Sequence, residues 1–164
     1  MEEFSLKEPV FTKRTTKVKT VVSSKINPYK VIISGSKKFC NYAVLKKNAD
    51  TFLKKKFPNV EVVSSTSLID KGLDHSFGPG KMGTTNLAKR WAKESGATIK
   101  LFKIDKIKYG RRANFICNRL MTRYADAILV FWDGVDLTTK HLIRVSKEQG
   151  LAVRVVMFLD EDVL

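Results

Sequence analysis

The sequence predicts an α/β protein built around an open, mostly parallel sheet of five or more strands, with helices on both faces. From residue 29 onward, short apolar runs rich in β-branched residues alternate with segments whose apolar residues recur at helical spacing. Glycine, proline or asparagine stands at most of the junctions. The chain has 164 residues, of which 43% are hydrophobic, so one domain with a sizeable core is expected.

The first strand is predicted at residues 30–36, where KVIISGS is a short β-branched run that ends in a glycine turn, as in a buried parallel strand. A helix follows, capped by Asn41 and extending to about Lys56, because its apolar residues lie on one face. Pro58 then breaks the chain, and VEVVSS at residues 60–65 is the second strand. Residues 66–77 are predicted to be a loop or an insertion.

The second half of the chain repeats the alternation. Thr84 or Thr85 is expected to cap a helix that contains NLAKRWAKES and ends at Gly96. The remaining elements are, in order, a strand at 98–104, a helix at 113–124, a strand at 126–134, a helix from Thr138 to Gln149 ended by Gly150, and a strand at 151–158. This order of elements is typical of Rossmann-like folds, in which ligands bind at the carboxyl ends of the strands.

Residues 1–28 form a separate basic extension ahead of the domain at residues 29–164. VFTKRTTKVKTVVSS is rich in threonine, valine and lysine, and we expect an ordered edge strand or hairpin, with a mobile arm as the alternative. Neither a long apolar run nor a signal-peptide pattern is present, which predicts a cytoplasmic protein without membrane contact. Cys40 and Cys117 form no metal-binding spacing, so free thiols and neither metal nor cofactor are expected.

The net charge of +15 is distributed unevenly along the chain. Residues 31–60 carry seven basic side chains against one acid, and residues 97–124 carry eight against one, whereas residues 125–164 carry four against seven. Such a charge attracts phosphate groups, either on a polymer or on a small nucleotide. A surface that only keeps the protein in solution is the alternative, and charge alone does not decide between them.

Three loops lie at the predicted carboxyl edge of the sheet, at residues 34–39, 78–85 and 133–140. In each, a strand is expected to end, small residues allow the backbone to approach a ligand, and a helix begins, whose free N–H groups favour an anion. None is a P-loop, since G-x-x-x-x-G-K-[ST] is absent, and none has the G-x-G-x-x-G dinucleotide pattern. Three such turns in one sheet predict a site for a nucleotide-type ligand.

Several of these stretches together resemble the SLOG superfamily in its YspA-like branch, which is related to the LOG nucleotide hydrolases and to the DNA-processing protein A fold. The stretches are KVIISGSKKF, GPGKMGTTNLAKRWAKESG, NRLM, YADAILVFWDG and TKHLI, and the resemblance covers about residues 29–158. It implies a Rossmann-like domain with a pocket for a ligand like NAD, ADP-ribose or a cyclic nucleotide. The resemblance also implies that the chain forms homo-oligomers. Proteins of this superfamily are enzymes or immune sensors of bacteria and phages.

The chain departs from this branch at positions that matter for chemistry. Where the branch has G-G-A-R-G-A-D, Gly80 and Gly83 remain, but Met82 replaces the arginine and Thr85 replaces the acid. An arginine expected just before N-R-x-M is Cys117 here. N-glycosidic cleavage requires an acid or base within reach of the reacting atom, so these replacements argue against hydrolysis. Cys117 is also a poor candidate nucleophile, because no histidine is near it in sequence.

The loops and the resemblance together predict a binding site without catalytic residues. Asp133 is expected to bind a ribose hydroxyl, and Trp132 either stacks on a base or packs in the core. The predicted ligand-binding residues are Ser34, Gly35, Ser36, Lys37, Gly80, Lys81, Met82, Gly83, Thr84, Thr85, Asn118, Arg119, Trp132, Asp133, Gly134, Thr138, Thr139 and Lys140. Trp91, in contrast, is expected in the core.

Three functions follow as hypotheses. The first is a non-catalytic sensor or sequestering protein for a phosphorylated nucleotide derivative, which suits a role in phage infection or anti-phage defence. The second is a nucleic-acid binder that uses the basic N-terminus, Lys54–Lys56 and residues 100–123. No nucleic-acid-binding motif is present, and stacking aromatic residues are not expected to be interleaved with the basic ones. The third is a nucleotide N-glycosidic hydrolase that depends on Asp133 or Arg119.

Overall fold

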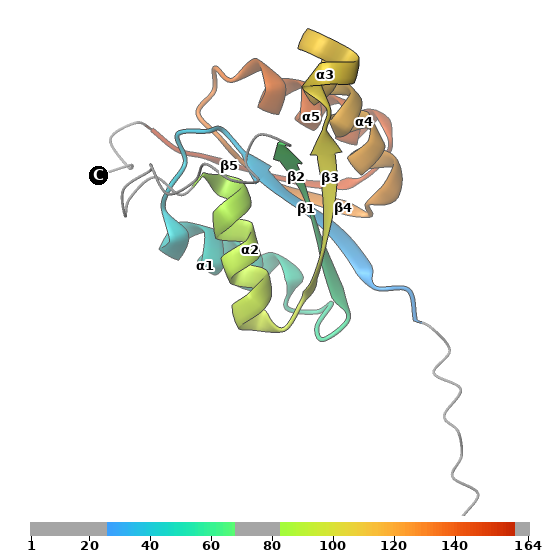
Figure 1. Ribbon diagram of the computed structural model, residues 1–164. Helices are drawn as coiled ribbons and strands as arrows, with labels where there is room; N and C mark the ends of the chain where they lie inside the picture. The colour runs from blue at the N-terminus through green and yellow to red at the C-terminus, as the bar shows by residue number, and fades with distance from the viewer. Residues whose placement is uncertain (1–25, 68–82, 160–164) are drawn as a thin grey trace, which may run out of the picture.

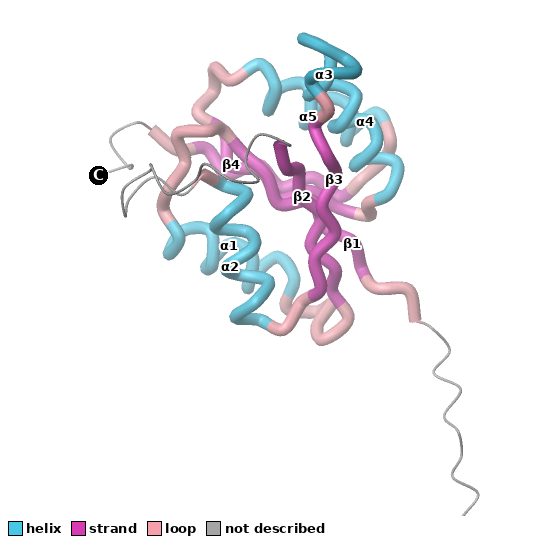
Figure 2. The backbone as a smooth tube through the Cα atoms, viewed as in Figure 1, coloured by secondary structure: helices cyan, strands magenta, loops and turns pink. Residues whose placement is uncertain are grey.

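The computed structural model describes residues 26–67 and 83–159, and these form one five-stranded parallel sheet with helices on both faces (Figures 1 and 2). The strand order is β3-β2-β1-β4-β5. The strands are β1 (Tyr29–Gly35), β2 (Val60–Ser67), β3 (Thr98–Ile104), β4 (Ala127–Trp132) and β5 (Ala152–Met157). The predicted fold class is therefore confirmed, and the sheet is parallel throughout.

Two pairs of long helices cover the two faces of the sheet. The helices α1 (Tyr42–Leu53) and α2 (Thr84–Ser95) pack on one face, and α4 (Ala113–Tyr124) and α5 (Leu137–Glu148) pack on the other (Figure 1). A short helix α3 (Lys106–Tyr109) and a 3₁₀ turn η2 (Gly110–Arg112) connect β3 to α4. The alternation of side chains along a strand explains the two layers: Val31 and Ile33 face α1 and α2, whereas Ile32 faces α4 and α5.

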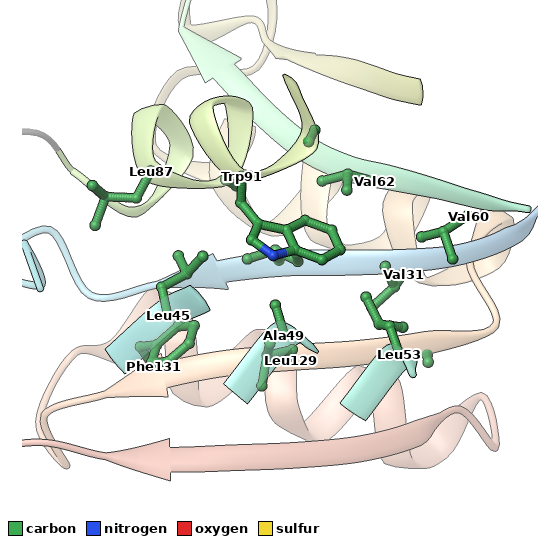
Figure 3. Packing of buried hydrophobic residues seen from close by; sticks show 14 of the residues in the cluster. Val31, Leu45, Ala49, Leu53, Val60, Val62, Leu87, Trp91, Leu129 and Phe131 are labelled. Atoms are coloured by element: carbon green, nitrogen blue, oxygen red, sulfur yellow. The ribbon is translucent and has the colours of Figure 1, made fainter. Parts of the chain in front are cut away.

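Trp91 fills the centre of the first core, between α2 and the sheet. Its ring lies above Val31 and Val62 and opposite Leu45 of α1 (Figure 3). The indole N–H donates to Asp50 Oδ1 at 2.9 Å, so the polar atom of this buried side chain is satisfied. The predicted core position of Trp91 is confirmed.

The ends of several elements differ from the sequence prediction, and each difference has a local cause. Helix α1 has the predicted Asn41 cap, whose side chain accepts from the N–H of Val44, but it ends at Leu53. Helix α2 is capped by Gly83 rather than by Thr84 or Thr85. Both threonine hydroxyls donate instead to backbone carbonyls of the sheet edge, at Ser36 and at Ser65.

Helix α5 begins earlier than predicted, because Asp136 rather than Thr138 is its N-cap. Strand β2 continues through Thr66 and Ser67, which were predicted to belong to a loop. The rest of that loop, and residues 1–25 of the N-terminal extension, lie outside the described residues. Helix α3 was not predicted; its N-cap Asp105 accepts from the N–H of Lys108 at 2.9 Å.

Within the two described ranges, every helix is too short or too polar to cross a membrane. The same ranges contain no cluster of three histidine, cysteine or acidic side chains arranged to hold a metal ion.

Candidate functional site

The strand order places β1 beside β4, with the following helices on opposite faces of the sheet: α1 follows β1 and α5 follows β4. The connections that leave these two carboxyl ends therefore diverge, and the fold has its topological switch point there. A depression of about 440 Å³ opens at this place. It is lined by Ser36, Lys37, Lys38, Asp133, Val135, Asp136, Leu137 and Thr138.

A tight turn after β1 sets the position of the two lysines. The N–H of Ser36 donates to the carbonyl of Phe131 at 2.9 Å, and the N–H of Phe39 donates to the carbonyl of Ser36 at 3.0 Å. The ring of Phe39 is buried and stacks on Phe131 with 4.3 Å between ring centroids. Because both ends of the turn are fixed in the core, Lys37 and Lys38 are held exposed at the rim of the depression.

The start of α2 adjoins this turn. The hydroxyl of Thr84 donates to the carbonyl of Ser36 at 3.3 Å, and the hydroxyl of Thr85 donates to the carbonyl of Ser65 at the same distance. Gly35 permits this close approach, since a Cβ there would lie 3.0 Å from Thr84 Oγ1 and 2.5 Å from the carbonyl oxygen of Phe131. The two threonines thus position the first turn of α2 above the carboxyl ends of β1 and β2.

The N-terminus of α2 differs from those of α1 and α5. Asn41 caps α1 and Asp136 caps α5, so side chains already accept from the first N–H groups of these two helices. In the described part of the chain no side chain caps α2, and its first turn contains no acid. Among the described residues, the N–H groups of Thr84 and Thr85 have no acceptor within the helix and no capping side chain, which is the arrangement that suits an anion.

Asp133 and Asp136, which also line the depression, hold the connection between β4 and α5. Asp133 Oδ1 accepts from the N–H groups of Val135 at 3.0 Å and Asp136 at 2.9 Å. Asp136 Oδ2 accepts from the N–H of Thr139 at 2.8 Å and from its hydroxyl. Burial raises the pKa of Asp133, but the bonds from these N–H groups and from the Ser36 hydroxyl outweigh it and hold the pKa below its ordinary value.

Asn118 lies in NRLM and His141 in TKHLI, two of the stretches that resemble the SLOG superfamily, and the two side chains contact each other between α4 and α5. The side-chain amide of Asn118 donates to the carbonyl of Thr138 at 3.1 Å and to His141 Nδ1 at 3.2 Å. Burial lowers the pKa of His141, and the positive charges of Arg144 and Arg119 lower it further. A neutral imidazole with its proton on Nε2 fits this geometry, because Nδ1 must accept from the amide. Asn118 therefore joins two helices in this structure, and Arg119 is exposed beside them.

Trp132 and Cys117 both point into the second core. The indole N–H of Trp132 donates to the carbonyl of Asp136 at 3.1 Å, and the ring packs against the cluster between the sheet and α4–α5. The Sγ of Cys117 lies 3.7 Å from the carbonyl oxygen of Phe102. Burial raises the pKa of this thiol to about 11, so it is protonated at neutral pH and is a weak nucleophile.

The structure brings part of the predicted site together. Ser36, Lys37, Asp133 and Thr138 line the depression, and Gly35, Gly83, Thr84 and Thr85 adjoin it. Ser34 precedes Gly35, the last residue of β1, Gly134 follows Asp133 with a φ of 87°, and Thr139 supports the Asp136 cap. Lys140 is exposed on α5, and Gly80, Lys81 and Met82 lie outside the described residues.

Four residues of the predicted loops 34–39 and 133–140 line the depression but were not among the predicted ligand-binding residues: Lys38, Val135, Asp136 and Leu137. Asp136 carries a usable signal, since an aspartate three residues before a threonine at the start of an amphipathic segment is typical of a helix N-cap. No protein-family model matches the chain, and no curated protein matches it significantly.

Proposed function

We propose that the chain binds a phosphorylated nucleotide derivative at the carboxyl ends of β1 and β4 without converting it. The observation that carries this proposal is the first turn of α2, which no side chain of the described residues caps, beside two exposed lysines. The hydroxyls of Thr84 and Thr85 orient this turn, and Lys37 and Lys38 add two positive charges at the rim. Backbone N–H groups at a helix start, together with ammonium groups, are a common binding arrangement for phosphate.

The two walls of the depression differ in charge, and this favours a ligand with two unlike ends. Lys37 and Lys38 come from the turn after β1, whereas Asp133 and Asp136 come from the connection between β4 and α5. Phosphate is repelled by carboxylates, so we place it near the lysines and α2. The carboxylate side suits a hydroxyl-bearing sugar, as acids in many Rossmann-like sites bind ribose. A volume of about 440 Å³ is in the range of small-molecule sites.

Binding without turnover agrees with the side chains available. Both carboxylates already accept hydrogen bonds from the backbone of their own loop, and the Cys117 thiol is buried and protonated. The resemblance to the SLOG superfamily supports ADP-ribose, NAD or a cyclic nucleotide as the ligand class. A sensor or a sequestering protein needs only to hold such a molecule, and we propose this role.

The Gly83→Asp variant tests the proposed phosphate position. Gly83 has a φ of −60°, and a Cβ there meets no atom within 4 Å, so other residues fit without strain. An aspartate at this N-cap is expected to accept from the first N–H groups of α2, as Asp136 does in α5, and to repel phosphate. The fold should keep or slightly gain stability, while binding of ADP-ribose, NAD or cyclic AMP is lost.

Isothermal titration of these three nucleotides supplies the readout, and Gly83→Ala is the matched control, since it adds a side chain without charge or cap. The control is expected to bind almost as the original chain does. Equal affinity of the Gly83→Asp variant and the original chain would contradict the site. Mass spectrometry of the nucleotide after incubation tests the absence of turnover, and release of a free base would overturn it in favour of the hydrolase hypothesis.

A further inference from the structure

The outward face of α4 carries a row of arginines with an aromatic ring between them. Arg112, Phe115, Arg119 and Arg123 follow at spacings of three and four residues, so their side chains leave the helix on one side. All four are exposed, whereas Cys117 and others of the opposite face are buried. At 1.5 Å per residue, the row extends over about 16 Å of helix axis.

The elements before α4 extend this positive surface. Lys106 and Lys108 belong to α3, Arg111 to η2, and Lys100 to β3, on the face of the sheet that packs against α4. We call the face formed by residues 106–112 and the exposed side of α4 the α3–α4 surface. The single acid among residues 97–124 is Asp105, and its carboxylate caps α3. Within this stretch, no other carboxylate is therefore available to neutralise the surface.

The absence of acidic neighbours here contrasts with the helices elsewhere. Lys46, Arg90 and Arg144 each form an ion pair with an acid four residues later in the same helix. Within residues 26–67 and 83–159, none of the eight basic side chains of residues 97–124 forms an ion pair within 4.0 Å. Like charges gathered without acids repel one another, so the surface favours a polyanionic partner.

Two aromatic rings lie among these cations and are open to solvent. Tyr109 and Phe115 are each 38% exposed. Lys108 Nζ lies 5.1 Å from the centre of the Tyr109 ring, and the ring of Phe115 rests on His141 with 4.5 Å between centroids. Aromatic and basic side chains are therefore interleaved on this surface, contrary to the sequence-based expectation. Base stacking on exposed rings next to a cationic track is a common way to hold single strands.

We propose that the α3–α4 surface binds single-stranded nucleic acid, with its arginines on the phosphates and with Tyr109 and Phe115 stacking on bases. The exposed rings favour a single strand over a duplex, whose bases are already stacked. This surface consists of other residues than those that line the depression, so the inference does not depend on the proposed nucleotide site.

The charge contribution is tested by the triple variant Arg112→Ala, Arg119→Ala and Arg123→Ala. Fluorescence anisotropy with a labelled oligodeoxythymidine of about 20 nucleotides measures affinity across a series of salt concentrations. We expect about a tenfold loss of affinity at about 0.1 M salt. The slope of log affinity against log salt should fall by about 2, since each phosphate contact on a single strand contributes about 0.7.

A control variant removes the same charge from another face. Lys47, Lys54 and Lys55 are exposed at α1 and just after it, on the side of the sheet opposite α4. The sequence-based hypothesis also assigned Lys54–Lys56 to nucleic-acid binding, whereas the present proposal does not use them. Replacing Lys47, Lys54 and Lys55 by alanine is therefore expected to change affinity by less than about threefold, through net charge alone. Equal losses in the two triple variants, or an original chain whose binding of the oligonucleotide does not depend on salt, would overturn the proposal.

The stacking contribution is tested at Tyr109. Helix α3 has no buried residue, so truncating this side chain is not expected to disturb the core. Tyr109→Ala should weaken binding of the single strand at least about fivefold, while Tyr109→Phe retains the ring and the affinity. A duplex of the same length serves as competitor and should bind more weakly than the single strand. The single-strand assignment would be overturned if the duplex bound more tightly than the single strand and Tyr109→Ala left the affinity for the single strand unchanged. Gly83→Asp should bind the oligonucleotide normally, which separates this proposal from the nucleotide site.

Discussion

The imidazole of His141 is the residue through which we expect acid to weaken the fold. Burial and the nearby Arg144 and Arg119 lower its pKa, and its Nδ1 accepts from Asn118 only when the ring is neutral. A histidine whose pKa is lowered by folding makes its full contribution to stability at pH values above the pKa that it has in the unfolded chain, near 6.5. Below that pH the unfolded chain takes up the proton first, so the contribution is lost as pH falls towards the lowered folded pKa.

We therefore predict that the free energy of unfolding falls between about pH 7.5 and about pH 5.5, and falls less steeply in the His141→Gln variant. Urea unfolding of both chains at several values in this window measures the difference. The comparison cancels the titration of His75, which both chains share. Parallel pH dependences of the two chains would contradict the role of His141.

Gly35 and Gly83 stand in similar glycine-containing turns, yet their surroundings in the structure differ. A Cβ at Gly35 would meet the backbone oxygen of Phe131 at 2.5 Å, whereas a Cβ at Gly83 meets nothing within 4 Å. Gly35 is thus explained by packing between β1, β4 and α2. Sequence alone does not separate the two cases, because the atoms that crowd Gly35 belong to Thr84 and Phe131, which are 49 and 96 positions away.

At the scale of an element, the start of α5 depends on one carboxylate. Asp136 accepts from the N–H and the hydroxyl of Thr139, and Thr139 is buried. We predict that Asp136→Ala lowers the free energy of unfolding by about 1 kcal/mol, the usual loss for an N-cap. Chemical denaturation followed by circular dichroism measures this loss.

Asp105→Ala is the matched control, since Asp105 also caps a helix through its carboxylate. Helix α3 has four residues and buries none of them, so it can fray without exposing core. We expect this variant to lose less than about 0.5 kcal/mol. A loss for Asp136→Ala no larger than that for Asp105→Ala would show that the cap does not hold α5.

Elements with strong local patterns were predicted well, and their ends were not. TIKLFKI coincides with β3, and residues 113–124 coincide with α4, because apolar spacing marks them along the chain. The caps of α2 and α5 were misassigned because threonine is a common cap. In the structure, distant carbonyls of Ser36 and Ser65 engage the threonines of α2, and Asp136 caps α5.

At the scale of the whole molecule, the strand order brings the candidate site together. Residues 34–39 and 133–140 are far apart in sequence, and they meet only because β1 pairs with β4. The general rule for parallel sheets predicted which loops gather at the carboxyl edge. It did not predict that the turn after β4 is held by its own aspartates, since this depends on where the helix begins.

The surplus of positive charge predicts how the whole fold responds to salt. The chain carries 31 lysines and arginines against 16 acids. Such a surplus destabilises the compact state by self-repulsion, and salt screens it. Raising sodium chloride from about 10 mM to about 100 mM shortens the screening length from roughly 30 Å to roughly 10 Å. We predict a higher urea midpoint at the higher concentration.

The two triple variants sharpen this test, because they lower net charge equally at different places. In the part of the chain that the structure describes, the cations of the α3–α4 surface lie together without ion pairs. Removing Arg112, Arg119 and Arg123 should therefore reduce the salt dependence of the midpoint more than removing Lys47, Lys54 and Lys55 does. Urea unfolding of the three chains at both concentrations measures this order. If the urea midpoint did not change with salt, or if it changed equally in both variants, the repulsion would not be concentrated on the α3–α4 surface.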